Sequence, residues 1–388
     1  MPQVNINPGR MGSIMTAISS NLSTTAAAAS YSTGDNALTL ATGAYLISTV
    51  NDGLDLLGAS QAYDVTIDGL IAAADNSTFT GLWLSAGNTA TITVGQFGMI
   101  HGDYGLYIEG SGTIVNNGFI SGNTNDGIFL IGSGTDEITN TGYLGSASNY
   151  AIAIYFAAAG THTITNSGEI RGGNGVAIGS DSAVSAETIH NTGIITGNIF
   201  LGGGSDIIHN EAGAGVIYGS VDLGGGADFF YGGIFADTVV GGAGADHIVG
   251  NDGADVLDGG ANADVIFGGA GGDTLTGGTS KDIFVFDSAL SSAKFDTITD
   301  FSHVNDAFDI DNAVFIGLAG GTLDRRDFKV IASAKSNVGV DASDRILYDR
   351  TDGDLYFDRD GSGHHFGRVK FAHVDPDTVL NQADFFVV

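Results

Sequence analysis

The stretch GGAGADHIVGNDGADVLDGGANADVIFGGAGGDTLT, from Gly241 to Thr276, consists of four nine-residue repeats. Each repeat begins with glycine, carries an aspartate at its sixth position and has an apolar residue at its eighth. Glycine permits the positive φ angles of a tight turn, whereas the second half of each repeat is short and apolar enough to form a β-strand. Two repeats are therefore expected to form one coil of a β-solenoid.

The aspartates keep their nine-residue interval beyond this stretch. The series is Asp228, Asp237, Asp246, Asp255, Asp264, Asp273 and Asp282. Residues eighteen apart should stack on one edge of the solenoid, and the alternate residues on the other edge. Carboxylates stacked roughly 5 Å apart repel by about 1 kcal/mol in water and by more in a partly dry loop, so a cation between them is expected. Carboxylate and carbonyl oxygens in a flexible turn suit Ca2+ better than Mg2+.

The predicted calcium ligands are these aspartates together with glycines of the turns. The glycines are Gly241, Gly242, Gly244, Gly250, Gly253, Gly259, Gly260, Gly268, Gly269 and Gly271. Asp206, in the earlier stretch LGGGSD, is predicted to be a first site of the same kind. Phe235, Asn262 and Ser280 replace the fourth-position glycine, and asparagine tolerates a left-handed conformation best of the three. The number of calcium ions is therefore left open.

A longer repeat of the form I-x-N-x-G precedes the array. Its clearest copies are residues 114–122, 138–146, 164–172 and 189–197. The spacing of their glycines is typical of a solenoid coil with three short strands. The asparagines of the four copies align and can form an internal hydrogen-bonded ladder; they are Asn116, Asn140, Asn166 and Asn191.

The predicted fold is all-β: a right-handed parallel β-helix that continues into a calcium-binding parallel β-roll, with a C-terminal β-rich cap. The expected segments are an N-terminal arm or cap at 1–36, β-helix repeats at 37–222, the calcium-binding roll at 223–285 and the cap at 286–388. A cap is expected because an open solenoid end exposes strand edges and apolar core.

The cap contains one recognisable local signal. Residues 346–363 alternate strand residues around Asp352-Gly353, which predicts a β-hairpin. Asp358, Asp360 and Gly361 match part of a calcium loop without the full EF-hand spacing, so a further ion there is left open.

Charge and composition limit the possible partners. The formal net charge is -31, from 44 acidic and 13 basic residues, which disfavours nucleic acid and anionic membranes. No stretch approaches the roughly 20 apolar residues of a membrane span. The first residues lack the apolar core of a secretory signal, yet cytosolic calcium is too scarce for sites of the extracellular class. We therefore expect an extracellular protein that is exported without an N-terminal signal.

The nonapeptide array, over about residues 201–285, resembles the RTX, or haemolysin-type calcium-binding, repeats of secreted bacterial proteins. The later stretches FVFD, DTITDF, DASDRILYD and ADFFVV resemble the C-terminal region that follows such repeats in serralysin-like proteins. This resemblance implies folding on calcium outside the cell and an uncleaved C-terminal signal, with Asp384 and the apolar residues after it, for the type I secretion apparatus. The earlier coils are more loosely similar to the β-helical repeats of autotransporter passengers.

The activity of the earlier coils is open between a binding protein and an enzyme. The chain has no H-E-x-x-H zinc motif, no nucleophile elbow, no phosphate-binding loop and no lysine before Lys281. We therefore favour a non-enzymatic adhesin or structural protein with a polysaccharide or cell-surface ligand, and assign no catalytic residue. Four tyrosines can stack on sugars or pack against one another: Tyr104, Tyr107, Tyr143 and Tyr155.

A polysaccharide lyase or epimerase is the alternative. Such an enzyme needs a cation for the uronate carboxylate and usually a base for the adjacent proton. Arg171 is the only basic residue across 11–280, and bound calcium can supply a further charge. His190, His209 or a tyrosine can serve as the base, although the two histidines occupy equivalent positions and are expected to be stacked surface residues.

Overall fold

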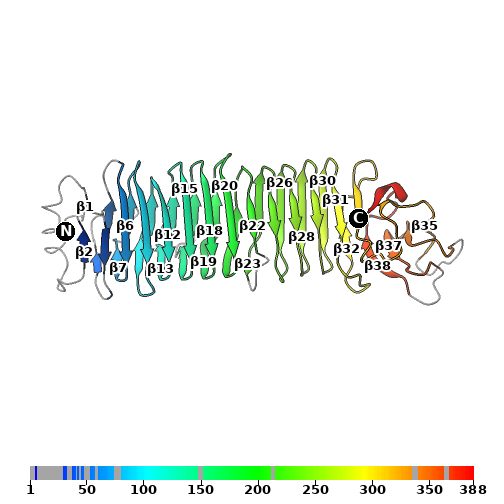
Figure 1. Cartoon of the computed structure of the whole chain (residues 1–388), viewed down its shortest axis with the longest axis horizontal. Coiled ribbons are helices and arrows are strands. Elements are labelled where there is room, and N and C mark those ends of the chain that lie inside the picture. Colours follow the sequence, from blue (N-terminus) through cyan, green and yellow to red (C-terminus); the bar gives the residue numbers. More distant parts are fainter. Residues whose placement is uncertain are drawn as a thin grey trace. The chain divides into compact units, whose positions relative to one another are not determined.

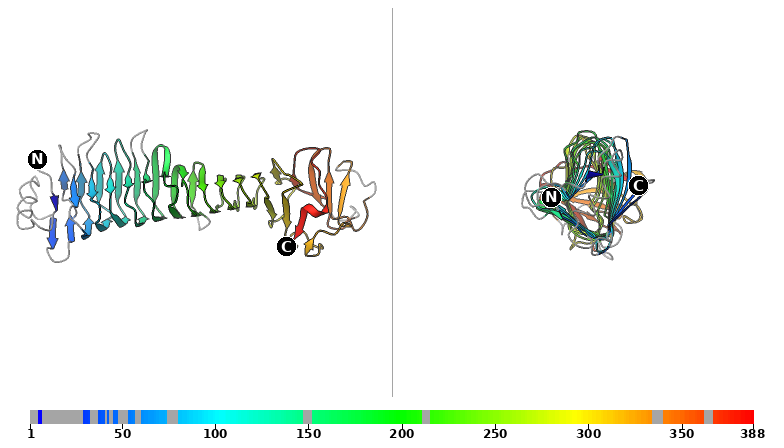
Figure 2. Two further views of the ribbon diagram at one scale, coloured as in Figure 1. Left: turned by 90° about the horizontal axis from the view of Figure 1, so that it is seen from above. Right: turned by 90° about the vertical axis from the view of Figure 1, so that its left-hand side faces the viewer.

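The computed structural model describes residues 5–6, 29–32, 37–40, 42, 45–47, 53–56, 60–73, 80–146, 152–210, 215–333, 340–361 and 367–388. It divides the chain into two compact units, Met1–Asp222 and Leu223–Val388. Across the described residues the secondary structure is β-strand with one short 3-10 helix, and most strand pairs are parallel (Figures 1 and 2). The all-β, parallel solenoid prediction is confirmed. None of the described segments is a helix long and apolar enough to cross a membrane.

The first unit places its strands in two sheets, A and B. Sheet A contains β1 (Asn5–Ile6), β4 (Tyr45–Ile47), β5 (Leu54–Leu56), β7 (Leu70–Ala72), β8 (Leu82–Leu84), β10 (Met99–Gly102), β11 (Leu106–Ile108), β13 (Phe119–Gly122), β14 (Ile128–Leu130), β16 (Tyr143–Ser146), β17 (Ile154–Phe156), β19 (Glu169–Ser180), β21 (Ile194–Phe200) and β23 (Val216–Tyr218). Sheet B contains β2 (Ala29–Ser32), β3 (Ala37–Leu40), β6 (Ala62–Ile67), β9 (Thr89–Val94), β12 (Ser111–Asn116), β15 (Thr135–Asn140), β18 (Thr161–Asn166), β20 (Ala186–Asn191) and β22 (Ile207–His209).

Three strands form each full coil of this unit. Two of them join sheet A and one joins sheet B, as in β10, β11 and β12. Equivalent strands of successive coils pair in parallel, so side chains at the same repeat position form columns. One interior column of sheet B is Ile92, Ile114, Ile138, Ile164 and Ile189, each at most 1% exposed. Each of these side chains contributes roughly 1.5–3 kcal/mol through its removal from water, so the coils stabilise one another only when stacked.

The asparagine ladder is confirmed. Asn116 Nδ2 donates to Asn140 Oδ1 at 2.7 Å, and the same bond links Asn140 to Asn166 and Asn166 to Asn191 at 2.8 Å. The ladder continues to Asn210, again at 2.8 Å, although Asn210 was not predicted to belong to it. All of these side chains are buried. The ladder therefore satisfies polar groups inside the solenoid and fixes the register of its coils.

The glycine two residues after each of the four predicted ladder asparagines is required by close backbone approach. A Cβ on Gly168 would lie 2.2 Å from the carbonyl oxygen of Gly142, and one on Gly142 would lie 2.2 Å from that of Gly118. No side chain fits at such distances without movement of the backbone. The I-x-N-x-G repeat thus combines an inward hydrogen-bonding residue with a turn that allows tight stacking.

We expect Asn166→Ala to destabilise the first unit by about 2 kcal/mol, since it removes two buried amide–amide hydrogen bonds, one to Asn140 and one to Asn191. Thr165→Ala is the matched control, because Thr165 lies on the same strand with an exposed side chain. Urea denaturation followed by circular dichroism measures both variants. Equal midpoints for the two would contradict a stabilising ladder.

The second unit contains the nonapeptide strands and the residues after them. Its strands in sheet A are β24 (Val221–Gly225), which begins just before the division, β26 (Thr238–Ala243), β28 (Val256–Ala261), β30 (Thr274–Thr279), β32 (Asp296–Ile298), β35 (Phe328–Ile331), β36 (Ile346–Asp349), β37 (Asp354–Phe357) and β38 (Val369–His373). Sheet B contains β25 (Phe229–Tyr231), β27 (His247–Val249), β29 (Val265–Phe267), β31 (Ile283–Phe286), β33 (Ala307–Ile310), β34 (Gly321–Thr322) and β39 (Phe385–Val387), which follows the 3-10 helix η2 (Gln382–Asp384).

Two nonapeptides form one coil of the array, as predicted. Thr238 pairs with Val256 in sheet A, and His247 pairs with Val265 in sheet B, so each strand contacts the strand eighteen residues later. Alternate repeats therefore contribute to opposite sheets. The apolar eighth-position side chains point inward, as Ile248, Leu257 and Ile266 show with 0% exposure.

The residues after the array add strands to its end. In sheet B, β31 pairs with β33 and β33 with β39; in sheet A, β32 pairs with both β30 and β38. The predicted hairpin is present as β36 and β37, joined through Gly353 at φ 80°. Asp358 has a basic partner, because Arg368 Nε lies 3.5 Å from its Oδ2. An arginine thus supplies the positive charge that a further ion would have brought to Asp358.

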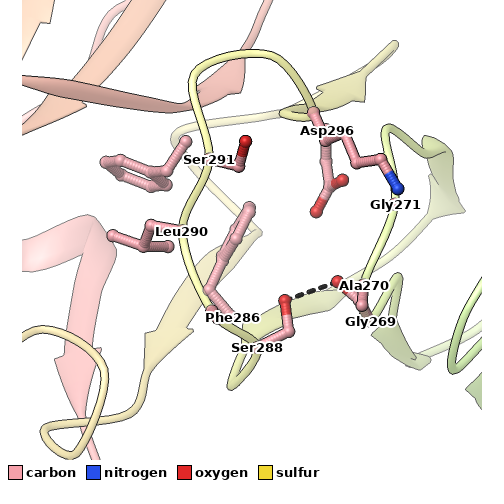
Figure 3. Close-up of a pocket in the computed structure, with 11 residues that line it drawn as sticks. Gly269, Ala270, Gly271, Phe286, Ser288, Leu290, Ser291 and Asp296 are labelled. Atoms are coloured by element: carbon pink, nitrogen blue, oxygen red, sulfur yellow. Dashed lines mark hydrogen bonds between the residues drawn. The ribbon is translucent and has the colours of Figure 1, made fainter.

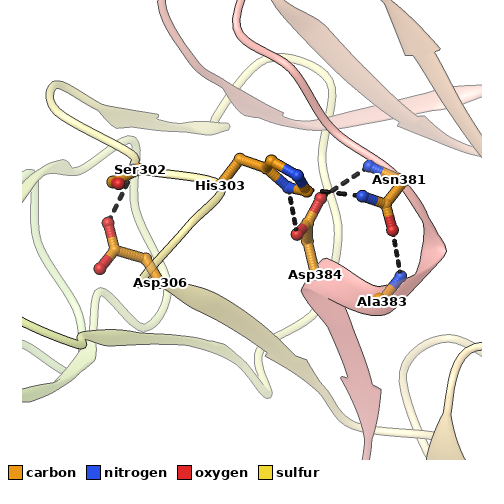
Figure 4. Close-up of polar contacts among 6 residues, drawn as sticks. All are labelled: Ser302, His303, Asp306, Asn381, Ala383 and Asp384. Atoms are coloured by element: carbon orange, nitrogen blue, oxygen red, sulfur yellow. Dashed lines mark hydrogen bonds and ion pairs between the residues drawn. The ribbon is translucent and has the colours of Figure 1, made fainter.

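A histidine that follows β32 contacts the residue just before the final strand, β39 (Figure 4). His303 Nδ1 lies 2.7 Å from Asp384 Oδ1, and Asn381 N donates to Asp384 Oδ2 at 2.6 Å. Asn381 Oδ1 accepts from Ala383 N, which completes a capping box at η2. Phe385 and Val387 are 1% exposed. Two of the terminal residues predicted to act in secretion, Phe385 and Val387, are therefore packed strand residues in the folded chain.

Candidate calcium-binding site

The repeat aspartates form two hydrogen-bonded stacks, as their spacing predicts. The backbone N–H of each of the first five aspartates donates to Oδ1 of the aspartate eighteen residues later. The pairs are Asp228 to Asp246 (2.9 Å), Asp246 to Asp264 (2.8 Å), Asp264 to Asp282 (3.0 Å), Asp237 to Asp255 (2.8 Å) and Asp255 to Asp273 (2.9 Å). Backbone amides therefore satisfy one oxygen of each accepting carboxylate. The sequence predicted a cation between the carboxylates but not these hydrogen bonds.

The second oxygen of these carboxylates is buried and accepts no hydrogen bond within the described part of the chain. This applies to Oδ2 of Asp246, Asp255, Asp264, Asp273 and Asp282, whose side chains are at most 2% exposed. A buried ionised oxygen without a partner costs several kcal/mol, and a bound cation removes that cost. A metal ion bound to the array would therefore contact these unsatisfied oxygens.

The first glycine of a repeat faces the unsatisfied oxygen. A Cβ on Gly241 would lie 2.5 Å from Asp246 Oδ2 and 2.6 Å from the carbonyl oxygen of Gly259. At Gly250 the distances are 2.3 Å to Asp255 Oδ2 and 2.6 Å to the Gly268 carbonyl. The same crowding by the repeat's own aspartate occurs at Gly259 and Gly268. These positions therefore keep open a small space bounded by hard oxygen atoms.

The donor set matches calcium. Among the described residues, no three acidic or histidine side chains converge on a common metal position. A hard cation in this array must therefore complete its coordination with backbone carbonyls, which Ca2+ accepts in its flexible shell of 6–8 oxygens. When bound, calcium supplies positive charge to the buried carboxylates; the chain supplies the turns that hold them in place.

The remaining predicted glycines shape the turns. Second-position Gly242, Gly260 and Gly269 have φ of 103°, 101° and 93°, and fourth-position Gly244 and Gly253 have 149° and 158°. Gly271 is needed for space instead, since its Cβ would lie 2.1 Å from the Gly253 carbonyl oxygen.

Two of the three positions where another residue replaces the fourth glycine also have positive φ, Asn262 at 83° and Ser280 at 101°. Phe235, the third, has an exposed side chain.

We expect Ser280→Gly to stabilise the second unit by about 1 kcal/mol, because a non-glycine residue with positive φ costs roughly 1–2 kcal/mol. Thr279→Gly is the control, since Thr279 ends strand β30 without a positive φ and loses stability when its side chain is removed. Thermal unfolding in saturating calcium compares the two. A lower unfolding temperature for Ser280→Gly would contradict the assigned turn strain.

Burial changes the acidity of the stacked carboxyls. It raises the pKa of Asp255 and Asp264 to about 7 and that of Asp237 and Asp282 to about 6, from an ordinary value of 3.8. Burial also raises the pKa of Asp246 and Asp273. Protons and calcium therefore compete for the same buried oxygens.

Asp206 belongs to the first unit and has the same backbone bond. Its Oδ1 accepts from Glu187 N at 2.7 Å. Burial has the largest effect on its acidity and the Glu187 carboxyl adds to it, so the pKa of Asp206 is raised to about 8.

Glu187 is paired in register with His162, and His162 with Asp136, whose Oδ1 accepts from Gly112 N. His162 Nδ1 lies 3.1 Å from Asp136 Oδ2, and both side chains are 1% exposed. An interior column of ionisable residues thus lies in the coils that precede the nonapeptide array.

Sequence reasoning missed Asp136, His162 and Glu187, and it missed two aspartates beyond the array. Asp273 N donates to Asp296 Oδ1 at 3.0 Å, and Asp282 N donates to Asp306 Oδ1 at 3.1 Å. A signal existed for both, because each is followed two residues later by an apolar residue, Ile298 or Phe308. Longer loops interrupt the nine-residue interval and conceal them.

Comparison with known families agrees with the geometry of the array. Residues 220–239, 231–266 and 258–288 match the family described as RTX calcium-binding nonapeptide repeat (4 copies). No curated protein matches the chain. The matched residues contain the strands and aspartate stacks described above, whereas the serralysin-like and autotransporter-like resemblances stay predictions. This chain therefore carries RTX calcium-binding nonapeptide repeats over residues 220–288.

Proposed function

We propose that this protein is exported unfolded by a type I secretion apparatus and folds on calcium outside the cell. The observation that carries the proposal is the set of buried, unsatisfied Oδ2 atoms in the matched repeats. Where calcium is scarce, these oxygens and the net charge of -31 oppose the compact state. Where calcium is abundant, its binding free energy becomes folding free energy.

The C-terminal segment is consistent with this order of events. Asp384 and Phe385 are buried in the folded second unit, so a receptor reads them only while that unit is unfolded. Truncation after Leu380 should retain the chain in cells that carry a type I apparatus. His303→Ala removes the partner of Asp384 in the folded state and should leave export unchanged. Normal export of the truncated chain would contradict the proposed route.

The first unit, in this proposal, is the attachment surface of a non-enzymatic adhesin. Tyr107, Phe129 and Tyr155 lie in register on β11, β14 and β17, with ring centroids 5.2 and 5.4 Å apart. A second pair, Phe119 and Tyr143, stacks at 4.7 Å with planes 10° apart. These rings pack against one another and remain half-buried. Partly exposed aromatic columns along stacked strands support binding of an extended polysaccharide.

The charge around the aromatic columns favours a neutral polysaccharide. Asp181 accepts from the Tyr155 hydroxyl, Glu169 lies beside Tyr143 in register, and Arg171 is the only basic residue between residues 11 and 280. A polyuronate would bring further negative charge to this surface. Neutral glycans are therefore the expected class of ligand.

Retention on immobilised polysaccharides tests this ligand class. The double variant Tyr107→Ala and Tyr155→Ala should lose most of the binding to a neutral glycan. Tyr218→Ala is the control, because Tyr218 is 63% exposed on the same unit and pairs with Thr196 instead of an aromatic residue. Binding confined to polyuronates, or equal binding by both variants, would contradict the proposal.

One observation favours the enzymatic alternative. A Cβ on Gly145 would lie 2.6 Å from the Tyr143 hydroxyl, and Gly145 is paired with Arg171, so a tyrosine and the isolated arginine share one face. Burial, however, raises the pKa of Tyr143 and makes it a weaker acid, which opposes a role as an ionised base. His190 and His209 stack at 4.9 Å with planes 3° apart, as predicted for surface residues. Release of unsaturated uronate products would establish a lyase, with Arg171→Ala as the first variant.

A further inference from the structure

Threonines dominate the outward side of sheet B in the first unit. Strands β9, β12, β15, β18 and β20 pair in parallel without a shift of register, so their outward side chains form columns (Figure 1). One column is Thr91, Thr113, Glu137, Thr163 and Thr188, and the next is Thr93, Val115, Thr139, Thr165 and His190. These ten residues form the threonine face. Each of their side chains is exposed or half-buried.

The threonine hydroxyls of this face have no hydrogen-bond partner within the described part of the chain. Hydroxyls of the second unit do have partners. Thr276 and Thr299 bond to each other through their hydroxyls at 2.8 Å, and the Ser288 hydroxyl donates to the Gly269 carbonyl (Figure 3). Neighbouring threonines can therefore satisfy each other, as they commonly do across paired strands. The hydroxyls of the threonine face instead remain available to water or to a ligand.

The threonine face repeats in two directions. Paired strands lie about 4.8 Å apart, and successive outward residues of one strand lie about 6.6 Å apart. The threonine side chain is branched at Cβ and has few χ1 rotamers, so its methyl and hydroxyl groups keep fixed positions. Between the two columns, Ile164 and its equivalents are buried and hold each strand against the core. The result is a rigid lattice of methyl and hydroxyl groups.

The charge of this face limits its partner. The chain has 44 acidic residues, yet Glu137 is the only acidic residue of the threonine face, which also contains no lysine or arginine. An almost uncharged surface fits an uncharged partner. A single dissolved polymer would follow one column at a time, whereas a crystal plane contacts both columns along all five strands. The complementary partner is therefore an uncharged surface that repeats in two directions.

We infer that the threonine face binds ice. Water molecules on crystal planes of hexagonal ice repeat at intervals close to the two spacings of the face. The hydroxyls hold a first layer of water through hydrogen bonds, and the methyl groups order the water between them. The face then joins a crystal through water that is already arranged as in ice. This activity goes beyond the proposed function, because it uses sheet B and requires no glycan.

The first test introduces a long side chain into the face. The wild-type chain, folded in excess calcium, should be enriched in slowly grown ice and should show thermal hysteresis, a freezing point below the melting point. Thr163→Tyr should lose most of both effects. Thr196→Tyr is the control and should retain them, because Thr196 lies on sheet A between Arg171 and Tyr218. Exclusion of the folded wild type from ice, or equal hysteresis in the two variants, would overturn the inference.

The second test works in the opposite direction and applies even if Thr163→Tyr does not fold. Glu137→Thr removes the one acidic side chain from the face and completes a column of five threonines, so thermal hysteresis should increase. Glu169→Thr removes the same charge from sheet A, where Glu169 pairs with Tyr143 and Ile194, and should change nothing. Equal hysteresis in these two variants would show that the face is not the binding surface.

A crystalline neutral polysaccharide also presents a repeating, uncharged plane. Retention of the wild type on microcrystalline cellulose that Thr163→Tyr abolishes, without enrichment in ice, would overturn the ice inference and assign the face to a polysaccharide. The double variant Tyr107→Ala and Tyr155→Ala, which tests the glycan surface of sheet A, should keep the wild-type thermal hysteresis. Failure of the proposed glycan binding and failure of ice binding are thus separate results.

Discussion

Removal of calcium is expected to unfold the nonapeptide array, with loss of its β-sheet circular dichroism signal on addition of EGTA and recovery in excess calcium. The effect is large because five buried Oδ2 atoms lose their counter-charge together. At several kcal/mol for each uncompensated buried charge, the sum exceeds the roughly 5–15 kcal/mol by which a typical domain is stable. Deletion of a single surface interaction would produce no comparable change.

The choice of cation provides the control for this experiment. Magnesium at the same concentration should restore much less structure, because it requires a stricter octahedral shell than glycine turns supply. Scattering should show expansion of the chain in EGTA alongside the spectral change. Identical spectra with and without chelator would show that the array folds without calcium and would remove the basis of the proposed export mechanism.

Acid should partly replace calcium in this folding reaction. The folded pKa of Asp255 and Asp264 is about 7, above the unfolded value of about 4. The folded state therefore binds more protons, so the calcium-free fold is most stable below about pH 4 and loses stability as the pH rises to about 7. In EGTA, lowering the pH from about 8 to about 5 should increase β-sheet signal. A calcium-free chain that loses structure over the same acidification would contradict the raised pKa values.

The period of the array was predictable because a single residue type, aspartate, recurs in every repeat. Aspartate at every ninth position and an apolar residue two positions later determine which residues stack, and the observed register of eighteen follows from that pattern. The bond from Asp246 N to Asp264 Oδ1 was not predictable in the same way. It depends on the distance between adjacent coils, which periodicity alone does not state.

The residues that sequence reasoning missed share one physical cause. Asp136, His162 and Glu187 occupy one interior column, yet their chemical types differ and each stands two residues before an isoleucine in an otherwise ordinary strand. Asp296 and Asp306 retain the pattern of an aspartate and an apolar residue, but loops of different length precede them. A strict sequence interval identifies the stacked aspartates only where all coils have the same length. Where the loop length changes, strand pairing still places the aspartate in the stack, but the interval no longer reveals it.

Gly241→Ala should lower the stability of the calcium-loaded second unit by about 2 kcal/mol or more. The added methyl group would lie 2.5 Å from Asp246 Oδ2 and 2.6 Å from the Gly259 carbonyl oxygen, both inside contact distance. Overpacking of this kind usually costs 1–3 kcal/mol, and here it also displaces the oxygens that face the cation. Urea denaturation at several calcium concentrations separates the two contributions, since displaced ligands shift the calcium dependence and simple crowding does not.

Gly272→Ala distinguishes a requirement for space from the general sensitivity of a glycine-rich array. Gly272 also lies in a repeat turn, but the nearest atom to its Cβ would be the Phe295 carbonyl oxygen at 3.4 Å, an ordinary contact, and its φ is not in the left-handed region. This substitution should leave stability unchanged or raise it by about 0.4–1 kcal/mol, because alanine restricts the unfolded chain. Equal losses in both variants would mean that the array needs glycine for flexibility. A loss confined to Gly241→Ala would mean that the first glycine of the repeat keeps space open for the ion.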